Sequence, residues 1–181
     1  MTKNNRFTVL EGGRDKDATV NAVSLKVVPD SLNPLPVDVR VFEEDAHLVL
    51  TIDPVMRYTE EHPLRLMTRV LEAKPNRPGS IVINNTSWYA VVHDLDEEPT
   101  CRAEWVSQAY VTALALAEKK RVQKFGLPLL GCVHGNILPA ESLSLLLKAI
   151  KSNSFHHLKE IIILVLQHRV NDTKLLLQNT L

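Results

Sequence analysis

Hydrophobic and polar positions along the chain predict alternating strands and helices from residue 37 onward. Four short apolar runs are typical of strands: 37–42, 48–52, 80–83 and 88–93. The first two lie on either side of a polar turn formed by Glu43, Glu44 and Asp45, and the last two are joined by the turn-forming residues 84–87. Between the two pairs, the apolar residues of 64–71 recur at the spacing of a helix.

The C-terminal half continues this alternation. Apolar residues step by three and four through 103–117, which predicts a long helix with one buried stripe. Acidic residues precede that stretch and the basic residues 119–121 follow it, as the helix dipole favours. Two more strands are predicted at 125–130 and from 159, and two more helices at 139–151 and from 170. Pro139 stands at the first helical position, where proline is well tolerated.

One strand indicates how the sheet is covered. Residues 161–166, IIILVL, are apolar without alternation, which is typical of a central strand that is buried on both faces. The predicted fold class is therefore α/β, a three-layer α/β/α sandwich with a mixed, largely parallel central sheet. We expect residues 36–181 to form this domain and residues 1–35 to be an N-terminal extension or peripheral strands.

Composition and charge narrow the classes of function. The 181 residues carry 21 Lys+Arg and 21 Asp+Glu, so a broad nucleic-acid-binding face is not expected. No apolar run is long enough to cross a membrane, and the first residues lack the apolar core of a signal peptide. Two cysteines are too few for a disulfide framework, which favours a cytoplasmic protein with reduced thiols.

The stretch LPLLGCVHGNILP, residues 127–139, carries the strongest functional signal. It leads from a predicted strand through two glycines to a predicted helix, at the edge of the sheet where open α/β folds bind ligands. Glycines allow successive backbone N–H groups to converge on one anion, and a helix start favours negative charge. This pattern predicts a phosphate or diphosphate site, although glycine also occurs at such joints for geometry alone.

From about residue 78 to residue 150, the sequence resembles a macro domain, the ADP-ribose-binding fold. The resemblance lies in the strand pair PGSIVINNTSWYAVVHDLD, the helix AEWVSQAYVTALALAEKKRV and the loop-bearing stretch FGLPLLGCVHGNILP. It departs from the family in two places. The stretch TIDPVMRYTEEHPLRLM lacks the asparagines and glycines of the family's first loop, and the phosphate loop is one residue shorter, with valine in place of a glycine.

The resemblance implies a binding module for ADP-ribose or a related ADP-containing nucleotide, free or carried by an ADP-ribosylated protein. One alternative is a hydrolase that acts on ADP-ribosyl adducts, and another is an interaction protein of this fold that has lost the ligand. The implied ligand-binding residues are those of the loop: Gly131, Cys132, Val133, His134, Gly135 and Asn136. No cofactor is expected, and the oligomeric state and the presence of catalysis stay open.

Other polar residues are candidates from their positions. The family's acidic residue that contacts adenine has two possible matches, Asp45 and Asp53, and Gln167 follows the strand 161–166 at the same rim. The electropositive loop is expected to lower the pKa of the Cys132 thiol. His93 and the acidic residues after it favour a solvated loop over a metal site, so no metal site is expected.

Overall fold

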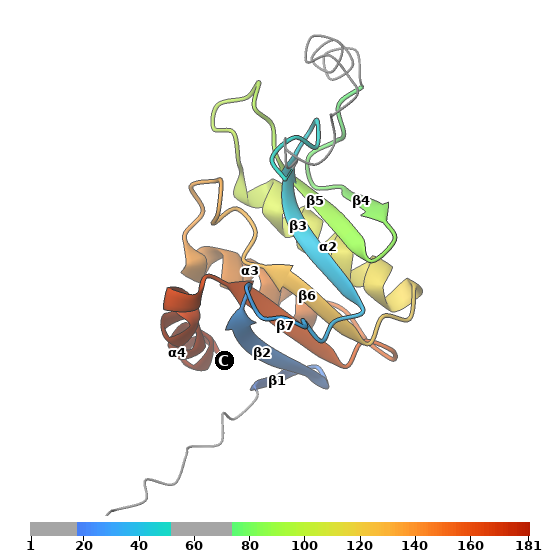
Figure 1. The fold of residues 1–181 in the computed structure, drawn as a ribbon, viewed down its shortest axis with the longest axis vertical. Helices are drawn as coiled ribbons and strands as arrows, with labels where there is room; N and C mark the ends of the chain where they lie inside the picture. Colours follow the sequence, from blue (N-terminus) through green and yellow to red (C-terminus); the bar gives the residue numbers. More distant parts are fainter. Residues whose placement is uncertain (1–17, 52–73) are drawn as a thin grey trace, which may run out of the picture.

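The computed structural model describes residues 18–51 and 74–181, which form a seven-stranded mixed sheet with helices packed against it (Figure 1). The strands are β1 (Ala18–Val20), β2 (Val23–Pro29), β3 (Val39–Asp45), β4 (Ile81–Asn84), β5 (Ser87–His93), β6 (Lys124–Pro128) and β7 (Glu160–Val165). Their order across the sheet is β1-β2-β7-β6-β3-β5-β4. The predicted mixed, largely parallel α/β sheet is confirmed.

Five neighbouring strands run parallel, and each edge strand is antiparallel to its neighbour. β2, β7, β6, β3 and β5 form the parallel part, whereas β1 pairs with β2 and β4 pairs with β5 in antiparallel register. The apolar strand β7 lies between β2 and β6, and its residues Ile161, Ile162, Ile163 and Leu164 are buried, as its unalternated sequence predicts. The carboxyl ends of the five parallel strands meet at one edge, where ligands of open α/β sheets bind.

Helices α2 (Ala103–Lys119) and α3 (Pro139–Lys151) cover one face of the sheet (Figure 1). Each buries the apolar stripe that its sequence predicts; in α3 this stripe includes Leu143, Leu146, Leu147 and Ile150. After β7, the short 3-10 helix η1 (Gln167–Arg169) leads into α4 (Val170–Thr180), which packs against β2 and α3. In the described part of the chain, no helix is both long and apolar enough to span a bilayer.

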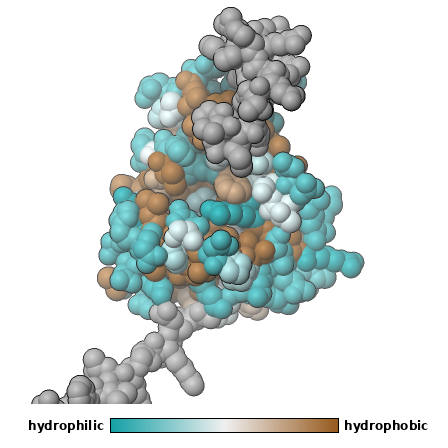
Figure 2. All heavy atoms as spheres, viewed as in Figure 1, coloured by the Kyte–Doolittle hydropathy of each residue, from teal (hydrophilic) through white to brown (hydrophobic). Residues whose placement is uncertain are grey.

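The face of the sheet opposite α2 and α3 is turned toward the viewer in Figures 1 and 2. The segment between β2 and β3 crosses this face. It packs closely on β6, because a Cβ added to Gly126 of β6 would lie only 3.0 Å from Cγ1 of Val37 in that segment. On β3, the Phe42 ring stacks on Tyr89 of β5 at 5.8 Å between centroids, with the Arg40 guanidinium 4.9 Å above Phe42. Figure 2 shows polar and apolar residues intermingled on this face.

The predicted hairpin around Glu43, Glu44 and Asp45 is wrong. These three acidic residues end β3 and are buried, with exposed fractions of 4%, 1% and 0%. The described residues that follow form turns instead of a strand, because their backbone N–H groups donate to the carboxylates of Glu44 and Asp45. For example, Asp45 accepts from His47 at 2.6 Å and from Val49 at 2.9 Å.

The N-terminal stretch contributes two strands of this sheet. β1 and β2 form the edge opposite β4, and β2 pairs with β7 in parallel over Ser24 to Pro29. The predicted boundary near residue 35 stays a prediction. Residues 1–17, the predicted helix at 64–71 and the candidate Asp53 lie outside the described residues.

Candidate functional site

A closed ring of buried hydrogen bonds fixes the end of β6. The Leu130 N–H donates to the Tyr110 hydroxyl at 2.8 Å, and the Ser142 hydroxyl donates to the Leu130 carbonyl at 2.7 Å. Because the single Ser142 proton is used in that bond, the Tyr110 hydroxyl donates to Ser142 Oγ, 2.7 Å away. Burial raises the pKa of Tyr110. Since Tyr110 belongs to α2 and Ser142 to α3, both helices hold the residue that precedes the glycines.

The glycine loop, residues 131–136, is compact. Gly131 has a φ of +78°, in the left-handed region that favours glycine, and a Cβ there would lie 2.7 Å from Ile137 Cγ1. A Cβ on Gly135 would lie 2.6 Å from the Gly131 carbonyl oxygen and 3.0 Å from the Cys101 sulfur. The two glycines are therefore required by the close packing of the loop against itself and its neighbours.

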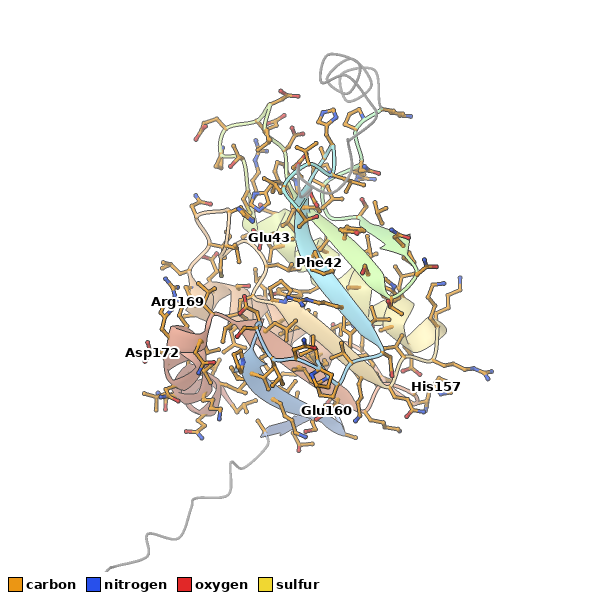
Figure 3. The ribbon with its side chains drawn as sticks, in the orientation of Figure 1. Phe42, Glu43, His157, Glu160, Arg169 and Asp172 are labelled. Carbon is orange, nitrogen blue, oxygen red and sulfur yellow. The ribbon has the colours of Figure 1, made fainter. Side chains whose placement is uncertain are left out.

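The carboxylate of Glu43 lies at the inner side of this loop. Glu43 Oε2 accepts a hydrogen bond from the Gly131 N–H at 2.8 Å, and Oε1 accepts from the His134 N–H at 3.2 Å. His93 at the end of β5 places Nε2 2.6 Å from the same Oε1. Glu43 and His93 are 4% and 1% exposed, so this cluster is removed from water. Figure 3 labels Glu43 and Phe42 on β3 beside the loop.

The backbone amides of the glycine loop fall into two groups. The inner amides, those of Gly131 and His134, donate to Glu43, and the Cys132 N–H donates to the Leu129 carbonyl at 3.3 Å. The outer amides, those of Val133, Gly135 and Asn136, make no hydrogen bond with another described residue. Val133 is 64% exposed. Part of the loop's predicted donor set is therefore already used within the protein, and three of its amides have no partner among the described residues.

The structure corrects the prediction for the Cys132 thiol. Burial, with a smaller contribution from the nearby Glu43 charge, raises its pKa to about 11, although a hydrogen bond with Ser142 and the Arg169 charge lower it in part. Burial and Glu43 together raise the pKa of Cys101 to about 12. Burial is the main reason that both cysteines are neutral thiols at pH 7, and the Glu43 carboxylate on the inner amides adds to it.

Two adjoining hollows beside the loop form a candidate ligand cleft, called the ligand cleft below. One has a volume of about 190 Å³ and is lined by residues that include Asp30, Phe42, Glu43 and His134. The other has a volume of about 200 Å³ and reaches Cys132 and Arg169. Both hollows share one set of lining residues: Pro128, Val133, Leu164, Val165 and Leu166. The cleft therefore runs along the carboxyl edge of the sheet, between the glycine loop and the ends of β2 and β7.

Two other candidate residues, Asp45 and Gln167, line neither hollow. Asp45 is fully buried and binds backbone amides of its own turn. Gln167 begins η1 and is exposed, and it does not line either hollow.

Sequence reasoning missed three residues of this region: Asp30 at the end of β2, Arg169 in η1 and Glu43 in β3. Asp30 directly follows a strand, so the strand-end rule applied to Asp53 and Gln167 points to it equally.

Comparison with solved structures identifies the fold. No protein-family model and no curated protein sequence matches this chain. A variant of the Oceanobacillus iheyensis macrodomain with ADPR is similar at TM-score 0.65 and 15% identity, over 91% of this chain and 95% of that one. The same macrodomain with ADP gives TM-score 0.64 at 14% identity, over 91% and 93%. The macrodomain of Thermus aquaticus DarG gives 0.56 at 16%, over 78% and 97%. The chain therefore has the macro-domain fold, as the sequence resemblance implied.

Proposed function

We propose that this macro-fold chain binds ADP-ribose or a related ADP-containing nucleotide in the ligand cleft. The observation that carries the proposal is the combination of groups along that cleft: the outer amides of the glycine loop, the Arg169 cation and the Asp30 carboxylate, with an apolar floor between them. Similar structures of the same fold contain ADPR and ADP. A nucleotide diphosphate suits such a cleft, because its base offers an apolar ring face to the apolar floor and its phosphates offer negative charge to the amides and Arg169.

The base is expected to lie between the ends of β2 and β7. Asp30 is partly exposed there, and its carboxylate is a hydrogen-bond acceptor suited to the exocyclic amine of adenine. Leu166 is 53% exposed and Val133 is 64% exposed, and both line the same hollow. Their apolar surfaces offer contact area to a planar ring. Asp30 thus takes the adenine-recognition role that the sequence resemblance left between Asp45 and Asp53.

The diphosphate is expected to lie across the outer face of the glycine loop. The amides of Val133, Gly135 and Asn136 are available as donors, and Arg169 lines the adjoining hollow. Figure 3 labels Arg169 next to α4, beside this loop. A guanidinium binds phosphate with paired, charge-assisted hydrogen bonds. The open cleft also suits a nucleotide carried by an ADP-ribosylated protein, and the two free cysteines suit the reducing cytoplasm.

Calorimetry with three ligands tests this proposal. We expect heat of binding with ADP-ribose and ADP and much weaker heat with AMP, because AMP lacks the second phosphate. Arg169→Ala should weaken ADP-ribose binding about tenfold through loss of a charged hydrogen-bond donor. Lys151→Ala removes an exposed cation from the far end of α3 and serves as the matched control. Absence of binding by all three nucleotides would overturn the proposal, as would equal effects of the two variants.

A further inference from the structure

Glu43 is a buried acid whose carboxylate joins three elements that are far apart in the sequence. It belongs to β3 and contacts His93 of β5 and the glycine loop after β6, which lie 50 and 88 to 91 residues further along the chain. The Glu43 side chain is 3% exposed and that of His93 is 1% exposed. A carboxylate in such surroundings is stable only when hydrogen bonds replace its lost water. Glu43 accepts from two backbone N–H groups, and His93 Nε2 lies 2.6 Å from its Oε1.

The two loop donors hold Glu43 in the way that a backbone anion site holds its anion. The N–H groups of Gly131 and His134 come from one short, glycine-bent segment and converge on the two oxygens of one carboxylate, at 2.8 and 3.2 Å. Converging backbone amides of this kind form concavities for phosphate and other anions. In this chain, the anion at the inner amides is a side chain of the protein itself.

This arrangement limits what a ligand can place at the same point. A phosphate oxygen that approached the inner amides would have to displace Glu43, and it would meet a like charge in a poorly solvated environment. A neutral hydroxyl group meets no such repulsion and can donate to the carboxylate. The outer amides of Val133, Gly135 and Asn136 have no hydrogen-bond partner among the described residues.

We propose that Glu43 is a built-in anion that occupies the inner amides of the glycine loop and thereby determines ligand specificity. The phosphates of the ligand then contact only the outer amides, and a neutral hydroxyl-bearing group of the ligand faces Glu43. Glu43 shapes the loop before any ligand arrives and disfavours ligands with an additional anionic group there. This inference refines the proposed function and rests on it only where nucleotide binding is measured.

Chemical rescue with a small carboxylate tests the inference without a nucleotide. In Glu43→Ala, the inner amides lose their anion, so we expect the melting temperature to fall and to rise again by several degrees in formate, compared with chloride at equal ionic strength. The unmodified protein should show no difference between the two salts. A merely structural Glu43, important for its packing alone, would give a variant that formate does not rescue.

Glu118→Ala is the matched control. Glu118 on α2 also accepts hydrogen bonds from consecutive backbone amides, those of His156, His157 and Leu158, but at a partly exposed site away from the cleft. Water can replace the lost carboxylate there, so formate should not rescue this variant. Equal rescue of Glu43→Ala and Glu118→Ala would show a general salt effect and would overturn the inference.

A second measurement uses the unmodified protein and does not depend on folding of a variant. The backbone amide resonances of Gly131 and His134 are followed by NMR during titration with inorganic phosphate. We expect both to stay unchanged, because Glu43 already holds these amides. A phosphate-dependent shift of both resonances would overturn the inference.

The nucleotide arm separates this inference from the proposed function. Glu43→Ala should weaken ADP-ribose binding about tenfold, because the loop loses the anion that shapes it and the ligand loses the acceptor for its hydroxyl group. Formate rescue without any ADP-ribose binding supports the role of Glu43 and overturns the nucleotide function. ADP-ribose binding that Glu43→Ala strengthens would overturn the inference, since the ligand's phosphates would then gain from contact with the inner amides.

Discussion

Each of the three acidic side chains that end β3 accepts hydrogen bonds from backbone N–H groups. Glu43 binds the glycine loop, whereas Glu44 and Asp45 bind the turn that follows the strand. Charge-assisted hydrogen bonds from amides replace the water that these carboxylates lose on burial. At the residue scale, the site is thus organised by internal anions that fix the backbone on both sides of β3.

Gly135 provides a residue-scale test of how tightly the loop is packed. Gly135→Ala should destabilise the protein by about 1–3 kcal/mol and weaken nucleotide binding, because the added methyl would overlap the Gly131 carbonyl at 2.6 Å. Urea denaturation measures the first effect and calorimetry the second.

The control for this prediction is Gly126→Ala in β6. The nearest atom to its added methyl, Val37 Cγ1 at 3.0 Å, belongs to a side chain on the crossing segment, not to the backbone. This substitution should cost less and leave binding unchanged. A larger loss of stability in Gly126→Ala than in Gly135→Ala would contradict the account of the loop.

Cys132 provides a test that depends on pH. Since burial and Glu43 raise the pKa of its thiol to about 11, the reactive thiolate is scarce at neutral pH and increases about tenfold per pH unit toward pH 10. Alkylation by iodoacetamide in a Cys101→Ser background should therefore accelerate throughout this range without levelling off. Free cysteine, whose thiol ionises near its usual value, is the reference. A rate that levels off below pH 9 would contradict a neutral Cys132.

At the scale of elements, the joint between β6 and α3 depends on the hydrogen-bonded ring of Tyr110, Ser142 and Leu130. The ring connects α2, α3 and the end of β6, so it sets where the glycine loop begins. All of its hydrogen-bonding groups are buried and paired. Loss of one hydroxyl would leave a buried backbone group without a partner, which is more costly than the net value of one hydrogen bond.

Tyr110→Phe tests this joint. It removes the acceptor of the Leu130 N–H, so we expect a loss of about 1–3 kcal/mol in the free energy of unfolding, measured by urea denaturation. Tyr89→Phe removes the same atom from a residue whose hydroxyl makes no hydrogen bond with a described residue, and it should change stability by less than about 0.5 kcal/mol. Equal effects of the two substitutions would contradict the role of the ring.

The elements were largely predictable because their patterns are local. Helix α3 begins and ends where the apolar spacing and Pro139 predict, and the unalternated apolar residues of β7 do lie in the middle of the sheet. The turn after β3 was not predictable in this way. From its local sequence, the acidic run of Glu43, Glu44 and Asp45 predicts an exposed turn. The burial of Glu43 depends instead on backbone amides of the glycine loop, which only the fold brings close to it.

At the scale of the whole molecule, the strand order and the edge that carries the cleft follow from the macro-domain fold, which the sequence resemblance implied and the solved structures confirm. The residues that line the cleft were harder to predict. Asp30 and Arg169 lie far apart in the sequence and meet the glycine loop only because β2 and β7 are neighbours in the sheet. Single-sequence patterns carry no information on such non-local pairing.

A crystal structure of the unmodified protein with ADP-ribose tests nucleotide binding in the ligand cleft most directly. We expect adenine between Asp30 and Leu166, the diphosphate on the amides of Val133, Gly135 and Asn136, and Glu43 still bound to Gly131 and His134. A ligand bound outside this cleft, or a cleft that stays empty at saturating ADP-ribose, would contradict this expectation.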